Sequence, residues 1–70
     1  MFIPTYGKNS LINVAHIVRV YIEPPYLEQR DYRVYASLSF GNGTVTLHRG
    51  NEESCAEYLK NFAKEVQNNG

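Results

Sequence analysis

The chain has 70 residues and a mass of 8.0 kDa, which predicts one small domain spanning residues 1–70. Its seven basic residues balance seven acidic residues, which argues against a protein whose main task is to neutralise the phosphates of long nucleic acids. No stretch of it approaches the roughly 20 apolar residues of a membrane-spanning helix, so we expect no membrane partner.

A domain of this size needs a supplement to its hydrophobic core, because one small core supplies only about 3–5 kcal/mol. A single cysteine cannot form an intrachain disulfide, and the two histidines and one cysteine lack zinc-ligand spacing. We therefore expect no metal and no cofactor, and a homo-oligomer. The first eight residues lack the order of a signal peptide, which together with one free thiol predicts a cytoplasmic protein.

The first half of the chain predicts two strands. Residues 1–12 suit a short edge strand at Phe2 and Ile3 that stops at Pro4, followed by a turn. Residues 13–23 alternate between apolar and polar, as a half-buried strand does, with the even-numbered residues on the apolar face. On that face His16 is interpreted as a boundary residue with satisfied hydrogen bonds rather than a metal ligand.

Residues 24–30 predict a loop, and residues 31–40 and 44–49 predict a hairpin closed at Asn42 and Gly43. A two-residue loop there would pair Phe40 with Val45, Ser39 with Thr46, Leu38 with Leu47 and Ser37 with His48. The register of the preceding hairpin is less constrained. If Glu23 pairs with Asp31, then Tyr21 faces Arg33 and Arg19 faces Tyr35.

Residues 51–67 change to a helical period, since Cys55, Leu59, Phe62 and Val66 recur at steps of four, three and four. Asn51 is a favourable N-cap, and residues 68–70 are expected to fray. The sequence thus predicts an α+β fold: an antiparallel three- to four-stranded meander sheet over residues 13–49, with one C-terminal helix packed on one face. Cys55 is expected to be a buried small hydrophobe.

The face of the sheet away from the helix is the candidate binding surface. It is predicted to carry Arg19, Tyr21, Arg33, Tyr35 and His48. Tyrosine rings stack on bases and arginine forks bind phosphates, so a nucleotide-like ligand or a protein partner would suit it. The alternative is a solvated face whose aromatic and charged pairs only stabilise the sheet. Tyr26, Leu27 and Tyr58 are candidate oligomer contacts.

The predicted neighbours His48 and Ser37 raise the question of catalysis. A serine and a histidine form part of a nucleophilic site, but a third group must orient the base. Neither Glu23 nor Asp31 is expected near His48, so we interpret His48 as a surface residue that hydrogen-bonds a hydroxyl. A weak hydrolase or nuclease that depends on His48 remains an alternative function.

The order HIVRVYI, YRVYASLSFGNGTVTLHRG, NEESCAEYLKNFAKEV resembles that of many short proteins of bacteria and their phages. The resemblance covers residues 12–67, lies in the pattern of periods, and carries over no functional residue. It implies a three-stranded meander closed by one helix. Several unrelated small phage proteins act by stoichiometric binding, as inhibitors of host defence or traps for nucleotide signals. We therefore expect a non-enzymatic binding module, with a structural homo-oligomer as the alternative.

Overall fold

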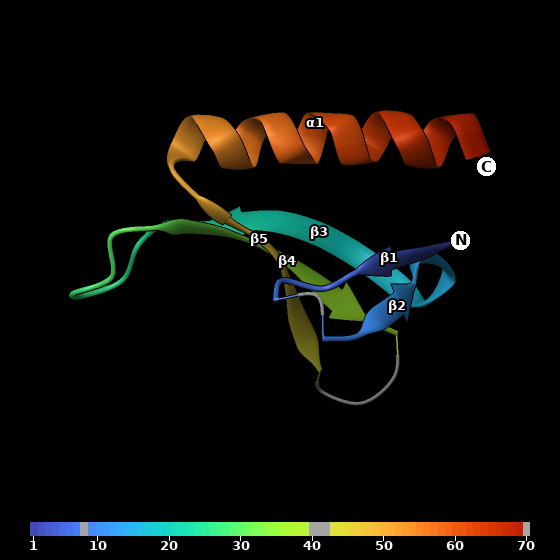
Figure 1. Cartoon of the computed structure of the whole chain (residues 1–70), viewed down its shortest axis with the longest axis horizontal. Helices are drawn as coiled ribbons and strands as arrows, with labels where there is room; N and C mark the ends of the chain where they lie inside the picture. The colour runs from blue at the N-terminus through green and yellow to red at the C-terminus, as the bar shows by residue number, and fades with distance from the viewer. Residues whose placement is uncertain (8, 40–42, 70) are drawn as a thin grey trace.

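The computed structural model describes residues 1–7, 9–39 and 43–69. In chain order the elements are β1 (Phe2–Pro4), β2 (Leu11–Asn13), the short 3-10 helix η1 (Val14–His16), β3 (Ile17–Glu23), β4 (Tyr32–Leu38), β5 (Thr44–Gly50) and α1 (Glu52–Asn69). Strands β3, β4 and β5 form an antiparallel sheet in that order, and β1 pairs with β2 in a separate two-stranded sheet. The predicted α+β fold is confirmed (Figure 1).

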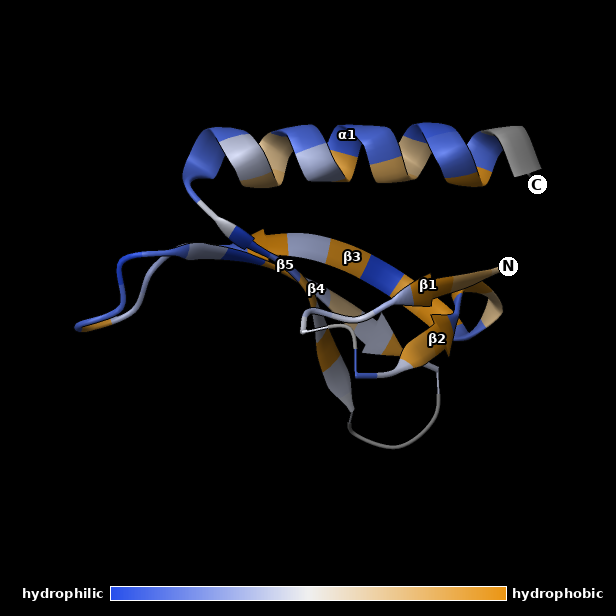
Figure 2. Cartoon of the chain, in the orientation of Figure 1, coloured by the Kyte–Doolittle hydropathy of each residue, from blue (hydrophilic) through white to orange (hydrophobic). Residues whose placement is uncertain are grey.

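Helix α1 lies across one face of the three-stranded sheet with its apolar side inward (Figure 2). Cys55 is fully buried, and Leu59, Phe62 and Val66 are half-buried, so the predicted apolar stripe is confirmed. The predicted N-cap is confirmed too, because the side chain of Asn51 accepts a hydrogen bond of 2.7 Å from the Ser54 N–H. The helix therefore begins where its sequence signals place it.

The core of this domain is small. Among the described residues, the buried hydrophobic side chains are Ile3, Val34, Ala36, Leu47 and Cys55. Two of them lie on the central strand β4, where both neighbouring strands and the helix cover them. With so few side chains removed from water, each buried residue carries a large share of the stability of the domain.

The N-terminal strand forms as expected but pairs differently. β1 pairs with β2 instead of joining the meander, and it brings Ile3 into the core. The Tyr6 N–H donates to the Thr46 carbonyl oxygen at 2.8 Å, which places this hairpin beside β5. Gly7 has a φ of 89°, a left-handed conformation that favours glycine in the turn. Lys8 lies outside the described residues.

The predicted continuous strand over residues 13–23 is wrong at its start. Residues Val14–His16 form η1, whose N-cap Asn13 accepts a hydrogen bond of 3.1 Å from the Ala15 N–H. His16 is consequently exposed rather than on the core face. A register shift between Ile17 and Arg19 then leaves Val18 66% exposed, although alternation had placed it inward.

The register between β3 and β4 differs by two residues from the pairing considered above. Glu23 pairs with Arg33, Tyr21 with Tyr35 and Arg19 with Ser37. The opposed acids Glu23 and Asp31 of that pairing do not occur, and neither do its crossed arginine–tyrosine pairs. Because side chains alternate with a period of two, a shift of two residues keeps the side chains from Arg19 to Glu23 on their predicted faces.

The predicted register between β4 and β5 is wrong. Ser37 pairs with Thr44, Ala36 with Val45, Tyr35 with Thr46 and Val34 with His48, in place of the predicted Leu38–Leu47 and Ser37–His48 pairs. The register shifts between Tyr35 and Val34, so Leu47 is an extra residue on β5, a β-bulge. Phe40 and Asn42 lie outside the described residues, whereas Gly43 of the predicted Asn42–Gly43 turn is described. The Leu38 N–H donates to the Gly43 carbonyl oxygen at 3.1 Å.

Candidate binding face

The bulge at Leu47 decides which side chains of β5 reach each face of the sheet. Leu47 itself is buried in the core, and His48 then pairs with the fully buried Val34, which puts His48 on the helix side. Arg49 pairs with Arg33 and so lies on the open side. The prediction that His48 belongs to the open face is therefore wrong, and Arg49 takes its place.

On the helix side, His48 contacts two residues of α1. Its Nε2 atom lies 2.6 Å from the Oγ atom of Ser54, and its ring stacks on the ring of Tyr58 with centroids 4.8 Å apart. The predicted hydroxyl partner Ser37 pairs with Thr44 instead. Burial, together with the charge of Glu65, raises the pKa of Tyr58 above its usual value. The ring of Tyr58, a candidate oligomer contact, is thus half-buried and packs against His48 of the same chain.

A hollow of about 480 Å³ opens beside the His48–Tyr58 stack. Its lining combines the turn after β1 with β5 and the helix: Pro4, Thr5, Tyr6, Gly7, Leu47, His48 and Tyr58. His48 and Ser54 supply an imidazole base and a hydroxyl, two of the three groups that form a nucleophilic site. Among the described residues no carboxylate hydrogen-bonds the His48 ring, so the group that would orient a catalytic base is not present.

On the open side, four of the predicted residues lie together. The rings of Tyr21 and Tyr35 are 5.8 Å apart between centroids and tilted by 44°. The Arg19 guanidinium carbon lies 4.5 Å from the centroid of the Tyr21 ring, a cation–π contact. Arg33 donates from Nη1 to the Tyr35 hydroxyl at 3.3 Å. We call these four residues, together with Arg49, the Arg/Tyr face.

The guanidinium of Arg33 is the electrostatic centre of the Arg/Tyr face. Its Nε atom is shielded from solvent and has no hydrogen-bond acceptor among the described residues. Arg33 also lies directly opposite Arg49, and like charges at opposed positions of a ladder are destabilising. Arg49 is compensated by Asp31, whose Oδ2 atom accepts from its Nε at 2.8 Å. Arg33 lies opposite Glu23 in the β3–β4 ladder, and its described side-chain hydrogen bond goes to the neutral Tyr35 hydroxyl.

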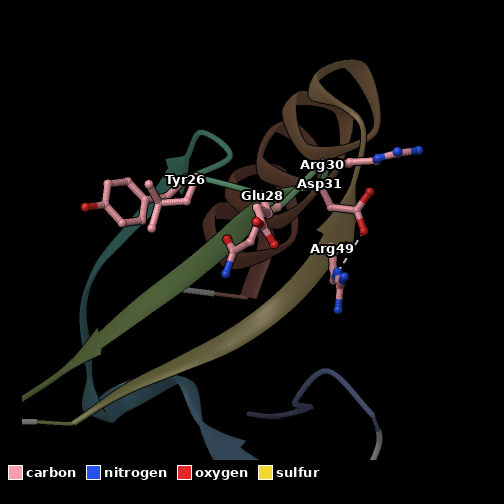
Figure 3. A pocket seen from close by; sticks show the side chains of 7 residues that line it. Tyr26, Glu28, Arg30, Asp31 and Arg49 are labelled. Atoms are coloured by element: carbon pink, nitrogen blue, oxygen red, sulfur yellow. Dashed lines mark hydrogen bonds and ion pairs between the residues drawn. The ribbon is translucent and has the colours of Figure 1, made fainter.

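Arg49 connects this face to an open hollow of about 860 Å³ at the β3–β4 loop (Figure 3). Figure 3 shows the ion pair between Asp31 and Arg49 at one side of the hollow and the Tyr26 ring at the other. The lining residues are Tyr26, Leu27, Glu28, Gln29, Arg30, Asp31 and Arg49. Tyr26 is 71% and Leu27 84% exposed, and Leu27 adopts a left-handed φ of 57°. Both predicted contact residues are therefore free of packing within the domain.

The charges of the chain are unevenly distributed although their sum is zero. Helix α1 carries four glutamates and two lysines, at Glu52, Glu53, Glu57, Lys60, Lys64 and Glu65. All four arginines belong to the sheet or to the loop that joins β3 to β4. The side of the molecule that carries the Arg/Tyr face is consequently more basic than the helix side.

Within the part of the chain that the structure describes, no three His, Cys, Asp or Glu side chains gather closely enough to hold a metal ion. No helix there has the length and apolar character required to cross a bilayer. Comparison with models of known protein families, with curated proteins and with solved structures finds no match.

The sequence did not identify two residues of these clusters, Arg49 and Ser54. Straight alternation along β5 would turn Arg49 toward the helix, and only the bulge at Leu47 reverses that. Ser54 follows Asn51 by three residues, so the N-cap signal placed it in the first turn of α1. Its contact with His48 depends on how the chain turns from β5 into α1, and no local sequence pattern predicts that turn.

Proposed function

We propose that this chain is a non-enzymatic binding module whose Arg/Tyr face holds a compact anionic ligand with a flat ring, such as a nucleotide. The observation that carries the proposal is Arg33, which lies opposite another arginine, Arg49, in the ladder and donates a hydrogen bond to the hydroxyl of Tyr35 on the same face. A phosphate group bound between the two guanidinium groups would relieve the repulsion between Arg33 and Arg49.

The tyrosines supply the other half of the proposed recognition. Tyr21 and Tyr35 are half-buried, so their rings are fixed by packing yet remain accessible on one side of the sheet. A base stacked on such a ring contributes about 1–3 kcal/mol, and the contribution depends little on which base it is. The combination favours a ligand that joins an anion to an aromatic ring over an inorganic anion alone.

The size and charge of the surface favour a small ligand over a polymer. The five residues of the Arg/Tyr face come from three strands of seven residues each, and the acids Glu23 and Asp31 border them. A long nucleic acid would bring its phosphates against those acids as well as the arginines. Sequestration of the ligand requires no bond chemistry, and several unrelated small phage proteins act by such stoichiometric binding.

The proposal is tested by calorimetric titration with adenosine monophosphate, and with adenosine and ribose 5-phosphate as probes of the ring and the anion alone. We expect adenosine monophosphate to bind more tightly than either fragment. Arg33→Ala should weaken its binding by roughly 10- to 100-fold, as expected for the loss of hydrogen bonds to a charged group. Tyr35→Phe keeps the ring but removes the hydroxyl that Arg33 contacts, and should weaken binding less than Tyr35→Ala.

Lys60→Ala is the matched control, since it removes one exposed positive charge from the helix side of the molecule. If Lys60→Ala weakens binding as much as Arg33→Ala, the binding is non-specific and the proposed site is wrong. A dissociation constant above about 1 mM for adenosine monophosphate, with no nucleotide retained in native mass spectra of protein purified from cells, would overturn the ligand class. A co-purifying host protein would then favour blocking of a protein partner.

The distance of 2.6 Å between His48 Nε2 and Ser54 Oγ keeps a hydrolase as a second candidate function. In that case the hollow beside Tyr58 would hold the substrate, and Ser54 would be the nucleophile in place of the predicted Ser37. The discriminating measurement is turnover of ester and phosphodiester substrates. A hydrolase requires activity that is lost in both His48→Ala and Ser54→Ala, whereas the binding module requires none.

A further inference from the structure

We propose that the chain forms a symmetric homodimer in which the free edges of two β3 strands pair antiparallel, with Tyr21 at the two-fold axis. β3 is an outer strand of the three-stranded sheet, because it pairs with β4 along one edge and with no described strand along the other. An unpaired edge presents backbone N–H and C=O groups that another strand can use. The occupant that fits this edge is a second copy of the chain.

The regular part of this edge has defined limits. On one side the register shift between Ile17 and Arg19 interrupts the strand, and on the other Pro24 cannot donate a backbone hydrogen bond. The uninterrupted stretch is therefore Arg19–Glu23, and its midpoint is Tyr21. Two copies that use the whole stretch in antiparallel pairing must place the two Tyr21 residues opposite each other.

In this register the edge is complementary to itself in charge. Arg19 lies opposite the partner's Glu23, and Glu23 lies opposite the partner's Arg19, so each dimer contains the pair twice. Arg19 and Glu23 are both exposed in the single chain. Val20 and Ile22, half-buried on the helix side, oppose each other in the same way. A shift of the register by two residues would lose both charge pairs.

Exposed apolar side chains lie just beyond both ends of the same stretch. Val18 is 66% exposed before it, and Tyr26 and Leu27 are 71% and 84% exposed after it. The proposed register sets Pro24 opposite the partner's Val18. Figure 1 shows that the loop after β3 projects beyond the end of the strand, so in the dimer it continues along the beginning of the partner's β3. The proposed register therefore brings Tyr26 and Leu27 of each copy close to Val18 of the other copy.

The surface area of the single chain is consistent with a missing partner. A folded monomer of 8.0 kDa is expected to expose about 4,450 Å², whereas this chain exposes 5218 Å². The excess is close to the roughly 800 Å² that each partner buries in an interface of standard size. The small core of the domain leads to the same expectation of added stability from association.

The dimer would join two Arg/Tyr faces into one surface, because a two-fold axis perpendicular to the sheet keeps both helices on the other side. The partner's Arg19 would also neutralise Glu23, the acid that pairs with Arg33 in the ladder. The basic surface next to Arg33 would then be less opposed by a nearby carboxylate. This last consequence rests on the proposed function, whereas the dimer itself does not.

Light scattering coupled to size-exclusion chromatography over a concentration series measures the association. We expect the mass to rise toward twice 8.0 kDa with concentration. Arg19→Glu and Glu23→Arg each set like charges opposite each other and should raise the dissociation constant roughly tenfold. The double swap Arg19→Glu/Glu23→Arg restores opposite charges and should restore dimerisation. Lys60→Glu, a charge reversal on the exposed side of α1, should leave the dimer unchanged.

Oxidative cross-linking tests the register directly. Opposed residues of an antiparallel ladder have Cα atoms about 4.5–5.5 Å apart, within the range that a disulfide spans. Tyr21→Cys should therefore give a covalent dimer, whereas the wild type, whose Cys55 is buried, and Lys64→Cys on the outer side of α1 should not.

A protein that stays at 8.0 kDa at every concentration overturns the dimer. A dimer whose stability is the same in both single reversals and the double swap, or a Tyr21→Cys variant that does not cross-link, overturns this interface. Binding of adenosine monophosphate by a monomer would leave the proposed function intact. A wild-type dimer that does not bind adenosine monophosphate would overturn the proposed function and leave the dimer intact.

Discussion

The Nε2 atom of His48 lies 2.6 Å from the Oγ atom of Ser54, so a side-chain hydrogen bond joins strand β5 to the first turn of helix α1. The same imidazole stacks on Tyr58 one turn further along the helix. Because four residues separate Ser54 from Tyr58, both side chains lie on the same side of α1. His48 thus holds the beginning of the helix at a fixed position on the sheet.

This arrangement predicts coupled losses of stability. Ser54→Ala removes the hydrogen bond and should lower the free energy of unfolding by about 1 kcal/mol. His48→Ala also removes the aromatic stack and should cost roughly 1 kcal/mol more. Urea denaturation followed by circular dichroism measures both, and the double variant should lose less than the sum of the single losses. Strict additivity would mean that the two side chains do not interact in solution.

Gly50 leaves room for the same contact. A Cβ atom at this position would lie 3.0 Å from the Ser54 Oγ atom and 3.5 Å from the His48 Nε2 atom. Gly50→Ala should therefore push the start of α1 away from β5 and cost about 1–3 kcal/mol, as overpacking does. Gly43→Ala is the matched control, because among the described residues the atom that its Cβ would meet is the Leu38 Cδ1 atom, at 3.4 Å, near the end of a flexible side chain. Equal losses in urea denaturation would contradict this explanation.

Two valines of the sheet allow a matched test of where the core lies. Val34 is fully buried, whereas Val18 is 66% exposed beside the register shift in β3. Val34→Ala should cost roughly 2–3 kcal/mol from lost burial and the resulting cavity. Val18→Ala should change stability by less than about 0.5 kcal/mol at concentrations low enough to avoid association. Similar losses at the two positions would place the core elsewhere.

Three groups predict a loss of stability at alkaline pH. Burial raises the pKa of the Cys55 thiol above its ordinary value of 9.0, the hydrogen bond to Glu52 raises that of Tyr32, and burial raises that of Tyr58. The folded chain therefore holds protons that the unfolded chain releases, so the free energy of unfolding falls as pH increases. The fall should begin near pH 9, where the unfolded thiol ionises, and steepen near pH 10, where unfolded tyrosines ionise.

Denaturation curves measured from neutral pH to about pH 10.5 test this expectation. Cys55→Ala and Tyr58→Phe remove one titrating group each and should both flatten the decline. Tyr26→Phe is the control, since Tyr26 is 71% exposed and lies in the β3–β4 loop, away from the core. A free energy of unfolding that is constant up to pH 10 would contradict the prediction.

The parts of the fold that depend on local periodicity were predictable. The apolar stripe of α1 and its Asn51 cap are local features, and the structure has both. The placement of Arg19, Tyr21, Arg33 and Tyr35 on one face followed from alternation along β3 and β4. That placement did not depend on the correct register, because the two-residue error in pairing β3 with β4 preserved the face of each side chain.

The parts that depend on the bulge were not predictable from alternation. Leu47 enters the core and His48 binds Ser54, so two consecutive residues serve the same side of the sheet. A regular strand cannot turn neighbours to one side, and an extra residue in the ladder does. The Asn42–Gly43 signal favoured a tight turn and a regular register from local rules alone. Packing of the helix and the core onto β5 is a long-range effect that those rules omit.

The arginines on the sheet and the excess of glutamates on α1 give the neutral chain a permanent electric dipole. An approaching anion would turn the molecule so that its sheet leads, before any contact forms. Productive encounters should therefore be faster than random orientation allows. Raising the ionic strength shortens the range of this torque, so association should slow with added salt even though the net charge is zero.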